Sequence, residues 1–332
     1  MKRRQYSALL YSKYVRGFSL IELMVSLTIG LLISIAAFSA YLGAASASKI
    51  TDAQGRMNED AQAALSILTQ QIRMAQNNPI RANRTYEYRH NPVYTPYPAF
   101  TSIRPLSLYS LRGCDTKFDD ITKDGKAIEA LTCTSSPALS PHSIAINYEI
   151  DDPAATPAVG ITTDCLGNKP PKIGANFTMK AEDGSVTPVV VSYYFVENRF
   201  YIAPSLQGIP NLNCNGNGGS TGPQPLVENI EDLQFKYGTV SSLISPADIT
   251  TAPVAGYLTA ENVTKILPDA ADSWARVITI RICVLVRSEL PVLTDLASAR
   301  YIKCDGMEEE KPLDLRMRRA YSTTVVLRNR RL

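Results

Sequence analysis

Histidine is scarce in this 332-residue chain, which contains only His90 and His142. The chain also has no H-E-x-x-H sequence, no phosphate-binding P-loop and no C-x-x-C pair among its six cysteines. The sequence therefore lacks the common signatures of zinc peptidases, nucleotide hydrolases and zinc-binding modules. With two histidines, a catalytic triad has few options. The sequence therefore predicts a protein that is not an enzyme and has no cofactor and no small-molecule ligand.

Acidic residues are missing from positions 1–17, which hold five basic residues. Subtracting these five charges from the net charge of +3 leaves −2 for the rest of the chain. A body without a positive surplus gives no reason to expect nucleic acid as a specific partner. The arginines near the C-terminus are expected on an edge strand and tail, where solvation competes with binding to DNA or an acidic partner: Arg316, Arg318, Arg319, Arg328, Arg330 and Arg331.

Charge is also missing from Leu23 to Ser48, a run of 26 residues. An apolar run of 18 or more residues predicts a membrane span. The run is too long for the apolar part of an ordinary secretory signal, and the helical pattern continues past it. A plain anchor would keep its basic end inside the cell and its body outside. One carboxylate, Glu22, stands at the head of the run, where an ionisable group is costly and needs a partner.

The residues after the uncharged run predict an amphipathic helix. Apolar residues recur there at steps of three and four: Met57, Ala61, Ala64, Leu65, Leu68, Ile72 and Ala75. The sequence Asn-Asn-Pro at residues 77–79 predicts the end of the helix. A helix from Phe18 to Asn77 would be roughly 90 Å long at about 1.5 Å per residue.

Residues 80–332 lose the helical pattern and predict strands. Alternating or β-branched segments occur at 142–150, 226–238, 275–288 and 321–331. Residues 186–203 are expected to form a hairpin with its turn near Glu197 and Asn198. Loop-like tracts rich in Pro, Gly and Ser lie between these segments. The prediction is an α+β protein with a long N-terminal helix packed on an antiparallel sheet.

The six cysteines all lie downstream of the uncharged run and favour disulfides in an oxidising compartment. Six cysteines allow 15 pairings. Spacing favours Cys114–Cys133, Cys165–Cys214 and Cys283–Cys304.

Two weaker candidates for binding sites occur in the head. Asp120 and Asp124 have calcium-loop spacing, but the twelfth position of such a loop is Leu131 instead of a glutamate. An Asp-Gly turn is the alternative, and no metal is predicted. His90 stands among tyrosines, either as part of a binding face or in a loop packed with aromatics.

The sequence R-G-F-S-L-I-E at residues 16–22 resembles the leader junction of type IV prepilins. This resemblance implies that a prepilin peptidase cuts between Gly17 and Phe18 and methylates the new amino group of Phe18. It also implies that Glu22 of one subunit pairs with that amine on a neighbouring subunit, which would answer the need for a partner. The implied fold is that of the type IV pilins.

Segments of the head resemble the PilW family of minor pilins. These segments are 163–168, 226–238, 275–288 and 318–331. The resemblance implies a minor pilin that primes pilus assembly and forms part of the tip complex, in support of adhesion and twitching motility. It implies the inner membrane as the first location, with a periplasmic head, and then the pilus. The implied partners are the prepilin peptidase, other minor pilins and the major pilin.

The predicted organisation has four parts: a cleaved leader at 1–17, a membrane and assembly helix at 18–48, an amphipathic half of the same helix at 49–78, and a head at 79–332. Two other functions remain open from the sequence. A minor pseudopilin of type II secretion shares the leader and helix, and a membrane-anchored adhesin would bind its ligand with the isolated head. A membrane-tethered enzyme is a distant third.

Overall fold

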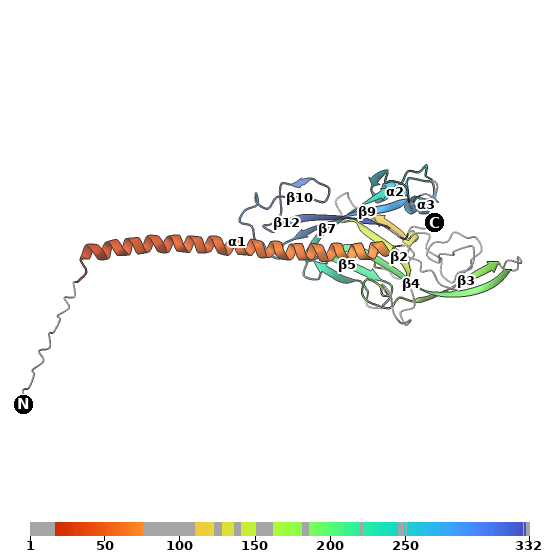
Figure 1. Ribbon diagram of the computed structural model, residues 1–332, viewed down its shortest axis with the longest axis horizontal. Helices are drawn as coiled ribbons and strands as arrows, with labels where there is room; N and C mark the ends of the chain where they lie inside the picture. Colours follow the sequence, from red (N-terminus) through yellow and green to blue (C-terminus); the bar gives the residue numbers. More distant parts are fainter. Residues whose placement is uncertain are drawn as a thin grey trace, which may run out of the picture. The chain divides into compact units, whose positions relative to one another are not determined.

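The structure is a computed structural model. It describes residues 17–75, 110–122, 128–135, 141–150, 162–180, 186–219, 222–244, 249, 251–327 and 329. The chain divides into two compact units, Met1–Thr51 and Asp52–Leu332. The first described element is a single helix, α1, at Leu20–Met74 (Figure 1). It contains 55 residues, slightly fewer than the predicted helix, and the predicted stop at residues 77–79 lies outside the described residues.

The part of α1 in the first unit has no covered face. Its large apolar side chains, from Leu20 to Leu42, are all exposed. The straight-chain and alanine content of this segment favours helix, and no proline interrupts it. Its serine and threonine hydroxyls bond back to carbonyls three or four residues earlier, as Ser34 does to Gly30. The apolar surface of this segment is therefore available to lipid or to other helices.

The part of α1 in the second unit buries the predicted apolar stripe. The side chains of Met57, Ala61, Ala64, Leu68 and Ile72 are at most 2% exposed. Their spacing places them on one face of the helix. One polar residue, Gln71, lies among them and is also buried.

The larger of the two main sheets has six strands. They are β1 (Leu111–Cys114), β2 (Ser143–Ile150), β3 (Lys172–Lys180), β4 (Val186–Pro204), β5 (Pro210–Gly216) and β6 (Gln224–Glu228). The order is β1-β2-β4-β5-β6, with β3 paired to the outer part of β4, and the pairings are antiparallel.

The predicted hairpin at residues 186–203 is wrong, because these residues form the continuous strand β4. Glu197 and Asn198 lie in its middle, opposite Asn147 and Ile146 of β2. Both side chains are buried and have partners, since Glu197 accepts from Arg199 and Asn198 donates to Gln71 of α1. Polar residues that suggest a turn in the sequence here form a buried network instead.

The second sheet has four strands in the order β12-β9-β7-β8. They are β7 (Ile230–Thr239), β8 (Gly256–Leu258), β9 (Val277–Arg287) and β12 (Arg318–Val326). The chain enters this sheet from β6 through Asn229, whose φ of 60° is a left-handed conformation that asparagine tolerates. One face of β7 points into the core, because Leu233, Phe235 and Tyr237 are fully buried.

Short elements complete the second unit. They are the helices α2 (Ala260–Thr264) and α3 (Ala270–Ala275), the 3-10 turn Ile128–Ala130, and the small pair β10 (Tyr301–Ile302) and β11 (Glu308–Glu309). The sequence pattern did not predict α2 or α3, since each is too short to show a helical period.

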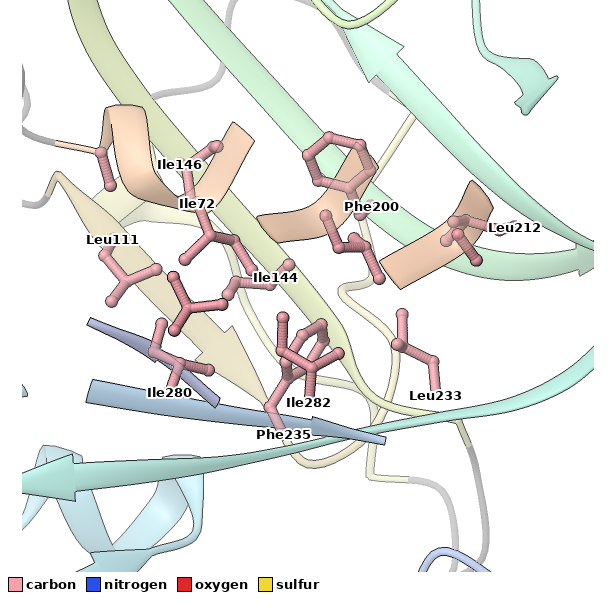
Figure 2. Packing of buried hydrophobic residues seen from close by; sticks show 14 of the residues in the cluster. Ile72, Leu111, Ile144, Ile146, Phe200, Leu212, Leu233, Phe235, Ile280 and Ile282 are labelled. Carbon is pink, nitrogen blue, oxygen red and sulfur yellow. The ribbon is translucent and has the colours of Figure 1, made fainter. Parts of the chain in front are cut away.

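The main core joins α1 to both sheets (Figure 2). Ile72 of α1 lies close to side chains of β1 and β2, and Ile280 and Ile282 of β9 lie beside Phe235 of β7. Apolar burial on this scale is the main stabilising contribution to the second unit.

All six cysteines form disulfides. The pairs are Cys114–Cys133, Cys165–Cys214 and Cys283–Cys304, with Cα–Cα distances of 5.8, 6.5 and 5.7 Å. They are the same pairs that spacing favours. Each bridge links residues of the second unit and restricts its unfolded chain.

Candidate functional site

The junction at residues 17–19 is an accessible stretch just before α1. Gly17, Phe18 and Ser19 precede the first helical residue, Leu20, and all are exposed. The Phe18 side chain is 88% exposed. A peptide bond outside a helix, with exposed flanking residues, can enter a peptidase active site without unfolding anything.

Ser19 and Glu22 form a capping box at the start of α1. The backbone N–H of Ser19 donates to Glu22 Oε2 at 3.0 Å, and the backbone N–H of Glu22 donates to Ser19 Oγ at 3.2 Å. Two helix-end donors are thereby satisfied. Glu22 was expected to pair with another subunit, and this local role was not expected. The Ser-x-x-Glu spacing is the signal that could have revealed it.

Beyond the junction, α1 presents a long apolar surface. Among the described residues, one helix, α1, is sufficiently long and apolar to cross a membrane. None of its most apolar segment is buried. In that segment the carbonyls and N–H groups are satisfied within the helix, as a lipid environment demands. The same surface can pack against other apolar helices.

Two family models match the chain. The PilW model, described as type IV pilus-assembly protein W, matches residues 199–329, and the prokaryotic N-terminal methylation motif matches residues 12–38. These two matches support a type IV pilus minor pilin of the PilW family. No curated protein and no solved structure matches it significantly.

The PilW match covers the chain from the middle of β4 to the end of the described residues, including all of β7, β9 and β12. The methylation motif covers the junction at residues 17–22 and the first part of α1. Together they support a pilin of a type IV pilus, and the methylation motif implies prepilin processing and assembly with other pilins. The pilin matches point to a structural protein.

His142 is a buried residue of the second unit. Its Nδ1 accepts a hydrogen bond of 3.0 Å from the backbone N–H of Phe235, and its backbone N–H donates to the carbonyl of Leu233. Burial lowers the pKa of His142, and the carboxylate of Asp115, 4.0 Å away, opposes that shift. His90 lies outside the described residues.

The calcium candidates do not come together as a site in the part of the chain that the structure describes. Asp120 lies in a turn, and its backbone carbonyl accepts a hydrogen bond from Arg199. Asp124 lies outside the described residues. Leu131 is fully buried. No group of three potential metal ligands occurs among the described residues.

Of the C-terminal arginines, Arg318 is the one most firmly held by acidic groups. Its guanidinium binds Glu231 at 2.6 Å and Asp314 at 2.6 Å, and its side chain is 6% exposed. Arg319 is exposed and lies over the Tyr321 ring. Arg328, Arg330 and Arg331 are not among the residues described.

A G-x-S-x-G spacing occurs at residues 218–222. In hydrolases this sequence marks a sharp turn from a strand into a helix. Here it follows β5 and precedes strand β6, so the required helix does not follow it. The spacing therefore carries no catalytic assignment.

Proposed function

We propose that this minor pilin primes assembly of a type IV pilus, forms part of the tip complex, and supports adhesion and twitching motility. The observation that carries the proposal is the exposed apolar surface of α1 at residues 20–51, joined to a head of the PilW family. The PilW match favours the pilus over the related pseudopilins of type II secretion.

The proposed organisation follows the four parts expected from the sequence. Residues 1–17 are a leader, residues 18–48 the membrane and assembly helix, residues 49–78 its amphipathic half, and residues 79–332 the head. Before assembly the helix spans the inner membrane with the head in the periplasm. The three disulfides of the head support this location, because such bonds persist in oxidising compartments.

The proposed priming mechanism is that minor pilins form a complex before the first major subunit joins. A preformed complex offers a surface on which the first major subunits make several contacts at once. Subunits added later make the same contacts with subunits already ordered, so the first steps are the unfavourable ones. A priming complex therefore raises the rate at which pili start.

Processing between Gly17 and Phe18, with methylation of Phe18, is the first step of this proposal. The non-helical, exposed junction supports it. The test is the N-terminal mass of the protein from sheared filaments, with and without the prepilin peptidase. Loss of residues 1–17 with one added methyl group is the expected result. An uncut chain would overturn the proposal.

Glu22 is proposed to pair with the methylated amine of Phe18 on a neighbouring subunit. A carboxylate left unpaired in an apolar bundle costs several kcal/mol, so pairing favours one register. The capping box gives Glu22 a second role, and the two roles separate by substitution. Glu22→Gln keeps a capping side chain but removes the charge.

We expect Glu22→Gln and Glu22→Ala to insert normally and to be lost from sheared filaments. Ser19→Ala removes the serine half of the box and keeps the charge, so it should be recovered with the filaments. Normal recovery of Glu22→Gln would show that the charge is dispensable and that capping is the role of this residue.

A further inference from the structure

The outer strand β12 has a free backbone edge. In the described sheet it pairs with β9 and is the first strand in the order. Leu327 donates to the carbonyl of Ile278, and Ser288 donates to that of Met317. In an antiparallel ladder the residues facing the partner alternate, so the odd-numbered residues of β12 face β9. The N–H and C=O groups of Ala320, Ser322, Thr324 and Val326 point the other way, where no described strand pairs with them.

This edge borders a groove between β12 and α1. The groove has a volume of about 700 Å³ and is lined by one flank of α1, from Gln62 to Met74, and by Ser322 and Thr323 of β12. The helix α1 and the strand β12 run side by side here (Figure 1). Hydrogen bonds join the two segments at both ends of the groove. The Tyr321 hydroxyl donates to Asn58 Oδ1 at 2.6 Å, and Asn329 Nδ2 donates to the Arg73 carbonyl at 2.8 Å.

Beyond the arginines at its start, Arg318 and Arg319, the edge of β12 has no charge and no proline to prevent strand addition. It is nine residues long, contains no proline and keeps an unbroken register with β9. The side chains of Ser322, Thr324 and Val326 are uncharged and exposed. By contrast, β8 at the opposite edge has three residues. The main path of the six-stranded sheet ends in β1, with four residues, and β6, which contains Pro225, while β3, off that path, begins and ends with a lysine.

The lining of the groove indicates what can occupy it. Its one charged residue is Arg73, and the others are amide, hydroxyl or apolar side chains. This composition suits an extended peptide with small polar side chains and one carboxylate opposite Arg73. Strand β12 of a second copy does not suit this groove. That strand has the α1 helix of its own chain beside it, so the two α1 helices would collide before the strands could pair.

We propose that an extended segment of another pilin binds this groove and adds a fifth strand to the β12 edge. The backbone hydrogen bonds of Ala320 to Val326 give affinity, and the lining of the groove selects the side chains, as in other cases of strand addition. The inference rests on the proposed function, since other pilins of the same assembly supply the segment.

Hydrogen exchange of the backbone amides tests the proposal directly. The full-length chain is measured in detergent and again in sheared filaments, with the position of each deuterium resolved by fragmentation. In the free chain the amides of Ser322, Thr324 and Val326 exchange rapidly, while those of Thr323 and Val325 are protected by β9. In filaments we expect the first group to exchange at least tenfold more slowly.

The outcomes separate this inference from the proposed function. A chain recovered in filaments with unprotected even-numbered amides would overturn strand addition and leave the proposed function standing. A wild-type chain that is absent from filaments would overturn both.

A proline on the free edge provides a matched variant. Thr324→Pro removes an N–H that points away from β9, so the ladder to β9 keeps its hydrogen bonds. We expect this variant to form its three disulfides and to fall at least tenfold in filament recovery. Thr324→Ala, which keeps the N–H, should be recovered as wild type. Equal recovery of the two variants would contradict the proposal.

Charge reversal tests the acidic character of the segment. Arg73→Glu places a carboxylate opposite the expected carboxylate and should lower recovery more than Arg73→Gln does. Equal recovery of both variants and the wild type would contradict a carboxylate of the bound segment opposite Arg73.

Discussion

The hydroxyl of Tyr237 is buried against Gly113 and has no hydrogen-bond partner among the described residues. Burial raises the pKa of Tyr237 well above its ordinary value. The missing side chain of Gly113 is what makes room for this ring, since an added methyl group would overlap the hydroxyl. The pair is therefore an example of close packing that tolerates no increase in volume.

We predict that Gly113→Ala lowers the free energy of unfolding of the second unit by about 1–3 kcal/mol, because the ring must shift. Tyr237→Phe should cost little or stabilise, since it removes an unpaired buried hydroxyl. In the double variant the loss should be smaller than in Gly113→Ala. Denaturant unfolding measures all three. A double variant as unstable as Gly113→Ala would contradict the steric explanation.

His142 predicts a pH dependence of stability. Burial of its ring favours the neutral form and lowers the pKa of His142. The unfolded chain takes up a proton at an ordinary pKa of about 6.5, before the folded chain does. Stability from this group is therefore full above that pH and is lost as the pH falls below it. Asp115 reduces the effect, and Lys236 adds to it.

The measurement is the free energy of unfolding at pH 7.5 and pH 5 for wild type and His142→Asn. Asparagine keeps an acceptor near the position of Nδ1 but does not titrate in this range. We expect the loss of stability toward pH 5 to be smaller in the variant. An equal loss in both proteins would assign the pH dependence to other groups.

Among the elements, α1 shows how one polar residue fixes the position of a helix on a sheet. Gln71 Oε1 accepts from Tyr148 at 2.9 Å and from Asn198 at 2.8 Å. A shift of the helix by one turn would leave these buried donors without an acceptor. Gln71 therefore specifies the register of α1, which the apolar stripe alone leaves less defined.

We predict that Gln71→Leu destabilises the second unit by about 1–3 kcal/mol, although leucine is the more apolar residue, because the Tyr148 hydroxyl loses its acceptor. The control is Gln70→Leu, which changes the neighbouring exposed position and should have little effect. Thermal unfolding distinguishes the two. A stabilising Gln71→Leu would show that the network adds nothing to stability.

The elements that the sequence predicted are those with strong local patterns. The stripe of α1 and the alternation in β7 and β9 follow from side-chain period, and both stripe and strands lie where they were expected. The turn predicted at Glu197 and Asn198 is wrong because both side chains have buried partners. The partner of Asn198 is Gln71, 127 positions away in the chain, so no local pattern could show it. The groove was equally out of reach, since it depends on β12 lying at a sheet edge beside α1.

At the scale of the whole molecule, the two units have opposite requirements. The large apolar side chains of the first unit are exposed, whereas the stripe that packs into the core starts at Met57. The three disulfides also belong to the second unit. The second unit thus holds the described core and the cross-links that a folded domain needs.

We predict that residues 52–332, produced in an oxidising compartment, fold as a soluble domain with the same three disulfides. Mass mapping of unreduced peptides and a cooperative thermal transition would check this. The full-length chain in detergent should unfold at a similar temperature. A fragment that aggregates or scrambles its disulfides would show that residues 1–51 are needed for folding.

The tie between Tyr321 and Asn58 joins residues 263 positions apart in the chain. Val325 and Leu327, at the C-terminal end of the described chain, complete the core around the stripe of α1. The ribosome synthesises α1 well before β12, which supplies some of the partners of its apolar stripe. Contacts so distant in sequence form late and slowly. During synthesis and export the apolar stripe of α1 is therefore uncovered for most of the time that the chain is emerging, a period in which the membrane or a chaperone must keep the helix from aggregating.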